Sequence, residues 1–280
     1  MSRYLICGDF HGNHPWAKKI IEVAQAEEID KIIQVGDFGV WPGEQGKEYL
    51  EILSRALVKR SIKLYFVPGN HEDFNQIDQW DKELPKNEDG HIEVKPNLFY
   101  AGKVNAWTWE GKRFASAGGA VSIDRAWRKL NETWWPQEQL TFLEKKKAMD
   151  LGKVDYLFSH DAPVDLPFSL LKKDLDSQAH RYTMTEIGRA IRPKLWFHGH
   201  YHRHVEYTFY HDDGETNVFG LDADPQGSKD PQLYNHAAVL DTDIDDVSFI
   251  KKHFNWWAKN FWFHRKHDAE TCVVCNRLGD

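Results

Sequence analysis

The sequence predicts an α/β protein. Short apolar runs rich in β-branched and aromatic residues, which are typical of buried strands, alternate with amphipathic helical patterns as far as Val67. Polar motifs rich in Gly, Asp, Asn and His follow five such runs, so we expect five strands to deliver these residues to one edge of a sheet, beyond the carboxyl ends of the strands. With 280 residues and 41% hydrophobic content, the chain is long enough for one large domain, alone or with an appendage.

Two helices separate the first three predicted strands. Pro15 suits the start of the first helix, because the N–H that it lacks would be unpaired there, and Ala17, Ile20 and Ala24 give the helix an apolar stripe. A similar stripe runs through residues 44–60. The order predicts a parallel βαβαβ unit with right-handed crossovers. The predicted strands that precede polar motifs are residues 4–7, 31–35, 64–67, 156–158 and 195–197.

The same periodicities predict the remaining segments. In order, they are a polar loop over the cleft (74–97), a hairpin (105–117), a charged amphipathic helix (136–151), a loop that lines a substrate entrance (161–178), a helix (184–191) and β-like segments of a second sheet (205–250). Trp127, Trp134 and Trp135 lie near a glycine-rich loop. In a chain with 12 tryptophans, we expect them to be core residues rather than platforms for stacking bases.

Five short motifs carry the chemistry. They are Gly8-Asp9-Phe10-His11-Gly12-Asn13, Gly36-Asp37-Phe38-Gly39, Gly69-Asn70-His71-Glu72, Ser159-His160-Asp161 and His198-Gly199-His200-Tyr201-His202. Their side chains offer hard oxygen atoms and neutral imidazoles, a mixture that first-row divalent metals accept. The candidate ligands are Asp9, His11, Asp37, Asn70, His160, His200 and His202.

Seven ligands are too many for one tetrahedral or octahedral ion that keeps an open position. Two ions bridged by one carboxylate and one hydroxide would use all seven. His200 and His202 are two residues apart, so in an extended segment they would point the same way and straddle the metal pair. The sequence therefore predicts a binuclear metal site.

The ordered motifs GD-x-H-G, GD-x-G, GNHE, a His after a strand, and GH-x-H resemble those of the calcineurin-like metallophosphoesterases over residues 4 to about 205. The resemblance implies a four-layer αββα sandwich of two mixed sheets flanked by helices. It implies one metal bound by Asp9, His11 and His202. It implies a second metal bound by Asn70, His160 and His200, with Asp37 as the bridge. His71 would face the scissile phosphate as an acid or oxyanion stabiliser, oriented by Glu72 or Asp73.

One motif departs from the pattern of the protein phosphatases in that superfamily. They extend the second motif to GD-x-V-D-R-G, whereas residues 36–43 here contain neither a second Asp nor an Arg. Arg125 is the predicted replacement, because its fork matches two phosphate oxygens, and Arg128 is a second choice. The alternative for both is a surface arginine paired with an acid. We therefore expect Asn70, His71 and Arg125 to contact the substrate.

The predicted activity is metal-dependent hydrolysis of a phosphate ester, with Asp37 and His71 as catalytic residues. Mn, Fe, Zn and Ni all suit the ligands, and Mn is favoured. A diester of nucleotide type is the first choice of substrate, because the phosphatase element is missing and the loops carry aromatic residues. The alternatives are a phosphomonoesterase, including one acting on phosphoprotein, and a catalytically silent binding protein. The last is disfavoured because no ligand position is substituted.

Composition limits the partners and the compartment. A net charge of −7 provides no basic surface for extended nucleic-acid binding. The sequence shows neither a membrane-spanning apolar stretch nor a signal peptide. Three cysteines, one of them in the first strand, argue against a disulfide framework, so we expect a reduced, cytoplasmic protein.

The composition changes after residue 252. Residues 1–252 form the predicted catalytic domain, and residues 253–280 form an aromatic extension that packs on the domain or on a second subunit as a homo-oligomer. His264, His267, Cys272 and Cys275 are ligand types of structural zinc, although their spacing is not that of a standard finger. A zinc site and a flexible tail both remain open interpretations.

Overall fold

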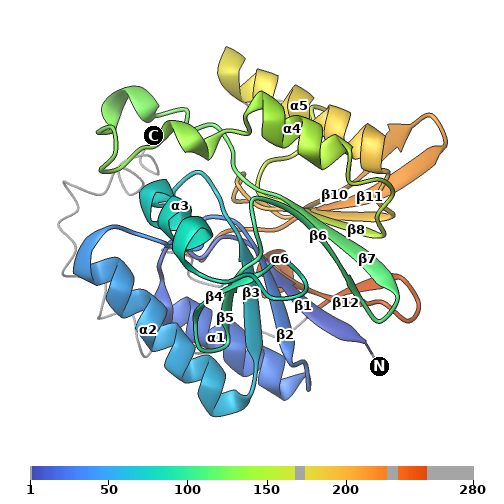
Figure 1. The fold of residues 1–280 in the computed structure, drawn as a ribbon. Helices are drawn as coiled ribbons and strands as arrows, with labels where there is room; N and C mark the ends of the chain where they lie inside the picture. Colours follow the sequence, from blue (N-terminus) through green and yellow to red (C-terminus); the bar gives the residue numbers. More distant parts are fainter. Residues whose placement is uncertain (1, 168–173, 226–232, 251–280) are drawn as a thin grey trace.

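Two mixed β-sheets lie face to face in the computed structural model, which describes residues 2–167, 174–225 and 233–250 (Figure 1). The strands of the seven-stranded sheet, in spatial order, are β13 (Asp246–Phe249), β12 (Ala237–Asp241), β1 (Arg3–Cys7), β2 (Lys31–Val35), β3 (Lys63–Val67), β5 (Leu98–Tyr100) and β4 (Ile92–Lys95). Those of the six-stranded sheet are β10 (Val205–His211), β11 (Gly214–Gly220), β9 (Leu195–His198), β8 (Tyr156–Ser159), β7 (Lys112–Ala117) and β6 (Val104–Trp109).

Helices cover the outer face of each sheet (Figure 1). The helical segments are α1 (His14–Ala26), α2 (Gly43–Arg60), α3 (Phe74–Glu83), η1 (Arg125–Trp127), η2 (Pro136–Glu138), α4 (Phe142–Met149), α5 (Leu175–Ile191) and α6 (Leu233–His236). Helices α1, α2 and α3 pack on the seven-stranded sheet, and α4 and α5 on the six-stranded one. The predicted αββα sandwich is confirmed.

Side-chain alternation along the strands separates the cores. On β1, Leu5 and Cys7 pack against α1, whereas Tyr4 and Ile6 pack against the second sheet. Both faces of the central strands are therefore buried, which explains why their sequences are continuously apolar. Strands β1, β2 and β3 are parallel, as predicted, and so their carboxyl ends lie at one edge.

Several predicted segments are wrong in detail. The polar segment 74–97 is not a loop, because Asp73 caps α3 and β4 follows it. The predicted helix 136–151 is two separate segments, η2 and α4, because Thr141 caps the N-terminus of α4. Helix α5 begins nine residues before Met184, the predicted start, because Asp174 caps it. Strands β12 and β13 join the first sheet rather than the second, which only long-range pairing decides.

The predicted extension 253–280 lies outside the described residues. It contains the aromatic residues and the zinc candidates His264, His267, Cys272 and Cys275. Among the helices that are described, none has the length and apolar content needed to cross a membrane.

Candidate metal centre

The five motifs meet between the two sheets. Strands β1, β2 and β3 contribute the first three motifs, and β8 and β9 of the other sheet contribute the last two. The prediction that all five strands share one sheet edge is therefore wrong, although the side chains do converge. Backbone hydrogen bonds join the motifs directly, from His11 N to the Asp37 carbonyl (2.8 Å) and from Gly199 N to the His160 carbonyl (3.2 Å).

One cluster of side chains has the geometry of a metal site. Ligand atoms of Asp9, His11, Asp37 and His202 all lie within 4.8 Å of one another. The His202 Nε2 atom is 3.3 Å from Asp9 Oδ2, and the His11 Nε2 atom is 3.5 Å from Asp37 Oδ2.

A second cluster adjoins the first at Asp37. The Nε2 atom of His160 lies 3.0 Å from Asn70 Oδ1 and 3.3 Å from Asp37 Oδ1. The His200 ring lies 4.9 Å from the His160 ring, measured between centroids. Asp37 thus presents its Oδ1 atom to this cluster and its Oδ2 atom to the first one.

The donor set fits divalent cations. Asp9 and Asp37 are almost fully buried, and among the described residues their ion-pair partners are histidines rather than lysine or arginine. Although burial opposes it, the neighbouring His160 lowers the pKa of both carboxyl groups, so they are ionised. Buried carboxylates that lack a permanent cation are costly unless a metal compensates their charge.

Neighbouring groups turn the ligand atoms of the second cluster inward. His160 Nδ1 lies 2.9 Å from the Val35 carbonyl, to which it donates, so the Nε2 atom is left as a ligand. Asn70 Nδ2 donates to Ser122 Oγ (2.9 Å), which leaves the Asn70 Oδ1 atom facing His160. Ser122 in turn donates to buried Glu138 through its hydroxyl (2.5 Å) and its backbone N–H (2.8 Å).

Asp224 orients a ligand of the first cluster, His11, and the sequence did not reveal this role. Its Oδ1 atom lies 2.8 Å from His11 Nδ1, and its Oδ2 atom accepts from Asn13 Nδ2 at 2.7 Å. Burial opposes protonation, but hydrogen bonds to Asp224 and Asp37 raise the pKa of His11 well above its usual range. The pocket around His11 therefore favours positive charge, as a cation site must.

His71 lies at the edge of the centre beside Arg128. The two terminal guanidinium nitrogens of Arg128 lie 2.8 and 2.9 Å from the ring nitrogens of His71. Arg128 also pairs with Asp124, whose Oδ1 atom is 2.9 Å from Nε. Burial lowers the pKa of His71 to about 3, and Arg128 adds to this effect against the opposing charge of Asp37.

Arg125 occupies a different position. It pairs with Asp174 (3.5 Å) and with Asp176 (2.7 Å) at the start of α5. These contacts match the alternative of a surface arginine paired with acids, and the structure places Arg128 rather than Arg125 against His71. The substrate-binding role of Arg125 stays a prediction.

Neither Glu72 nor Asp73 orients the His71 ring. Buried Glu72 accepts backbone N–H groups of Phe38 (2.6 Å), Gly39 (3.1 Å) and Val40 (2.8 Å), so it holds the loop that follows Asp37. Burial and the charge of Asp37 raise the pKa of Glu72 to about 7. Asp73 caps α3.

The backbone at the centre is strained, which is common at functional sites. Positive φ angles occur at four candidate ligands, namely His11 (46°), Asp37 (49°), His200 (70°) and His202 (50°). The segment of His200 and His202 is therefore bent, whereas the sequence predicted an extended segment. A Cβ atom at Gly36 would lie 2.2 Å from the His160 ring, so only glycine fits there.

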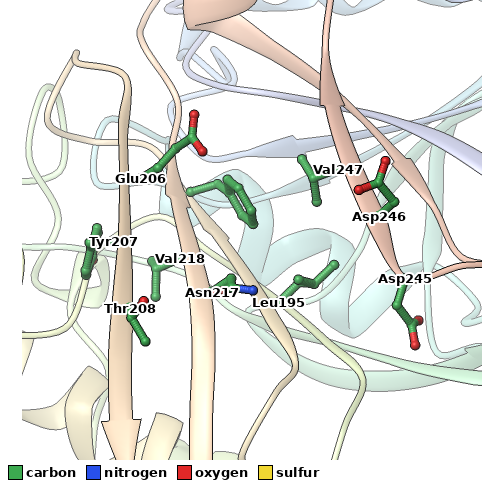
Figure 2. Close-up of a pocket in the computed structure, with 10 residues that line it drawn as sticks. Leu195, Glu206, Tyr207, Thr208, Asn217, Val218, Asp245, Asp246 and Val247 are labelled. Carbon is green, nitrogen blue, oxygen red and sulfur yellow. The ribbon is translucent and has the colours of Figure 1, made fainter.

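Other histidines and pockets lie apart from this chemistry. His180 is buried on α5, where its Nδ1 atom is 2.7 Å from Asp161 Oδ2. A cavity of about 440 Å³ lies between β9–β11 and the β12–β13 hairpin (Figure 2). Its carboxylate Asp245 already pairs with Lys112 (2.7 Å) and Lys194 (2.9 Å), and no candidate ligand lines it.

Comparison with known families agrees with this geometry. Residues 2–204 match the model of the calcineurin-like phosphoesterases. The chain belongs to the calcineurin-like phosphoesterase family. Within this family, divalent metals are typical cofactors, and the cluster of Asp9, His11, Asp37 and His202 could hold one. No curated protein matches the chain.

Solved structures are similar to this calcineurin-like phosphoesterase. The protein TT1561 of Thermus thermophilus is 14% identical, with a TM-score of 0.53 over 89% of this chain and 98% of that one. A dimetal phosphatase from Danio rerio is 12% identical, with a TM-score of 0.47 over 85% and 91% of the two chains. The likeness to TT1561 shows the fold alone.

Proposed function

We propose that this chain hydrolyses phosphodiesters of nucleotide type at a centre of two divalent metal ions, with manganese favoured. The observation that carries the proposal is the position of Asp37, whose two carboxylate oxygens face different clusters of ligands. Asp9, His11 and His202 would hold one ion. Asn70, His160 and His200 would hold the other, with Asp37 between them. When bound, such ions supply positive charge to the phosphate oxygens and lower the pKa of the attacking water.

The protein's own groups would position and stabilise the phosphate. Neutral His71, whose pKa is lowered to about 3, suits donation of an N–H hydrogen bond to a phosphate oxygen better than transfer of a proton. Arg128 beside it would donate a guanidinium N–H group to a phosphate oxygen. Asn70, fixed by Ser122, would contact the substrate as well as a metal.

Charge balance favours a diester over a monoester. A diester carries one negative charge, whereas a monoester carries up to two at neutral pH. The charge of Arg128 is already offset by Asp124, which contacts it at 2.9 and 3.0 Å. Beyond the metal ions, Arg128 therefore adds little uncompensated positive charge for the second negative charge of a monoester.

A phosphomonoesterase is the second candidate. The second motif lacks the arginine that protein phosphatases carry there, but Arg128 lies beside His71 and provides an arginine from another segment. This arginine favours the phosphomonoesterase. A catalytically silent binding protein is disfavoured, since all seven candidate ligands are present and six of them have short contacts within the two clusters.

Turnover of a chromogenic diester and the matching monoester, each with manganese and then with a chelator, tests the proposal. We expect chelator-sensitive cleavage that favours the diester. A preference for the monoester would replace the diester assignment with phosphomonoesterase activity. Absence of turnover with Mn, Fe, Zn and Ni would refute hydrolysis and support the binding protein.

A further inference from the structure

Large apolar side chains are exposed beside the metal centre. In the segment between Ser122 and Trp135, Ile123 is 45%, Trp127 80% and Leu130 57% exposed. Contiguous exposed apolar side chains mark binding surfaces more often than isolated ones do. The expectation that Trp127 belongs to the core is therefore wrong, whereas Trp135 is buried as predicted.

This segment is held firmly on both sides. Ser122 is fixed by buried Glu138 at its start, and Trp135 enters the core at its end. Arg125 ties the segment to the start of α5 through Asp174 and Asp176, next to Leu175, which is 79% exposed. We refer to Ile123, Trp127, Leu130 and Leu175 as the apolar rim.

The segment also reaches into the centre. Arg128 directly follows Trp127, and its two terminal guanidinium nitrogens contact the two ring nitrogens of His71. A neutral imidazole has only one acceptor nitrogen, so one of these two guanidinium N–H groups lacks an acceptor there. A phosphate oxygen would satisfy that donor. The segment thus carries a phosphate-binding group at His71 and an exposed indole on adjacent residues.

We propose that Trp127 is the platform on which the base of a nucleotide-type substrate stacks while its phosphate lies at His71 and Arg128. This inference rests on the proposed function and names the residue that selects the substrate. Stacking on an exposed aromatic ring accepts any base, because every base has a π face. A platform held in place before binding loses little entropy when the base stacks.

Two diesters with the same leaving group test the role of Trp127. The measured quantities are kcat and KM for thymidine 5′-(p-nitrophenyl phosphate) and for methyl p-nitrophenyl phosphate. For Trp127→Ala we expect kcat/KM of the thymidine diester to fall about tenfold, mainly through KM, since stacking is lost. The methyl diester should be affected less than about twofold, and Trp127→Phe should retain most of the preference.

Tyr210→Ala is the matched control. Tyr210 is also a large, exposed aromatic residue (68%), on the β10–β11 hairpin, which contributes no candidate ligand. It should leave both diesters unchanged. Equal losses with both diesters in Trp127→Ala would show a structural role and overturn the inference, as would no loss with either.

Binding measured without turnover separates this inference from the proposed function. By calorimetry on the manganese-loaded protein, Trp127→Ala should weaken the binding of thymidine 5′-monophosphate about tenfold and leave inorganic phosphate unchanged. If the wild type cleaved neither diester, the proposed function would fail, and this comparison would still decide the stacking. Equal affinity of wild type and Trp127→Ala for thymidine 5′-monophosphate, or no binding by the wild type, would overturn it.

Discussion

The carboxylate of Glu72 is predicted to hold the loop that carries Asp37. It accepts four backbone N–H groups at 2.6 to 3.4 Å and is fully buried. In Glu72→Gln, an NH₂ group must replace one oxygen. If it replaces Oε1, it faces the N–H groups of Phe38 and Gly69, and if it replaces Oε2, it faces those of Gly39 and Val40. Either orientation leaves at least one buried donor facing another donor.

The expected loss follows from this count. A hydrogen bond to a charged group contributes ~1.5–3 kcal/mol, and a buried donor without an acceptor adds a similar penalty, so we expect Glu72→Gln to lose about 3 kcal/mol or more of unfolding free energy. Urea denaturation of the metal-free protein at pH 8 measures it, because the pKa of Glu72 is raised to about 7 and the group is ionised above that pH. Manganese affinity should fall as well, since the Asp37 loop loosens.

Asp73→Asn is the matched control. The neighbouring Asp73 also accepts backbone N–H groups, from Asn75 (3.1 Å) and Gln76 (3.3 Å), but as a helix cap that is partly exposed. Asn caps helices about as well as Asp, so this change should cost less than about 0.5 kcal/mol. If the unfolding free energy of Glu72→Gln lay within about 1 kcal/mol of that of the wild type, the role of Glu72 in holding the Asp37 loop would be refuted.

Three further predictions concern separate parts of the protein. His91 is buried against Trp107 and Tyr65, neither of its ring nitrogens has a hydrogen-bond partner in the part of the chain that the structure describes, and burial lowers its pKa to about 4. The unfolded state therefore binds more protons between about pH 6.5 and 4, so stability is lost as the pH falls through this window, by up to ~3 kcal/mol from this residue. His91→Phe should make urea midpoints at pH 7 and pH 5 more alike, and an unchanged difference would contradict this. Asp224→Asn should weaken manganese binding ~10–100-fold in calorimetry by disturbing His11, whereas equal affinity would remove Asp224 from the site. Arg128→Gln should lower kcat/KM for the chromogenic diester about 100-fold and Arg125→Gln much less, and the reverse order would restore the sequence prediction.

The parts of the fold that the sequence predicted are those set by local pattern. Strands β1, β2 and β3 are buried on both faces, so they are continuously apolar, and the alternation with α1 and α2 is readable from spacing. Helix α3 was missed because its exposed face is polar and only Phe74 and Ile77 are buried. The placement of β12 beside β1 depends on pairing between Tyr4 and Leu240, which no local pattern records.

The candidate site divides in the same way. Its ligands follow strand ends in short motifs, so residue types and order were sufficient to nominate them. Asp224 lies 213 positions from His11, in no recognisable motif, and only folding brings the two together. Arg128 and Arg125 are three residues apart in one segment, and tertiary contacts alone place Arg128 on His71 and Arg125 on α5.

Metal stoichiometry tests whether Asp37 joins two metal ions in one centre. The metal-free protein would be loaded with manganese, passed through a desalting column and analysed by mass spectrometry, beside His202→Ala and Asp37→Ala. We expect about two manganese ions per wild-type chain, about one in His202→Ala, and fewer than one in Asp37→Ala, because Asp37 faces both clusters. One ion per wild-type chain, or two retained by Asp37→Ala, would contradict a binuclear centre joined by Asp37.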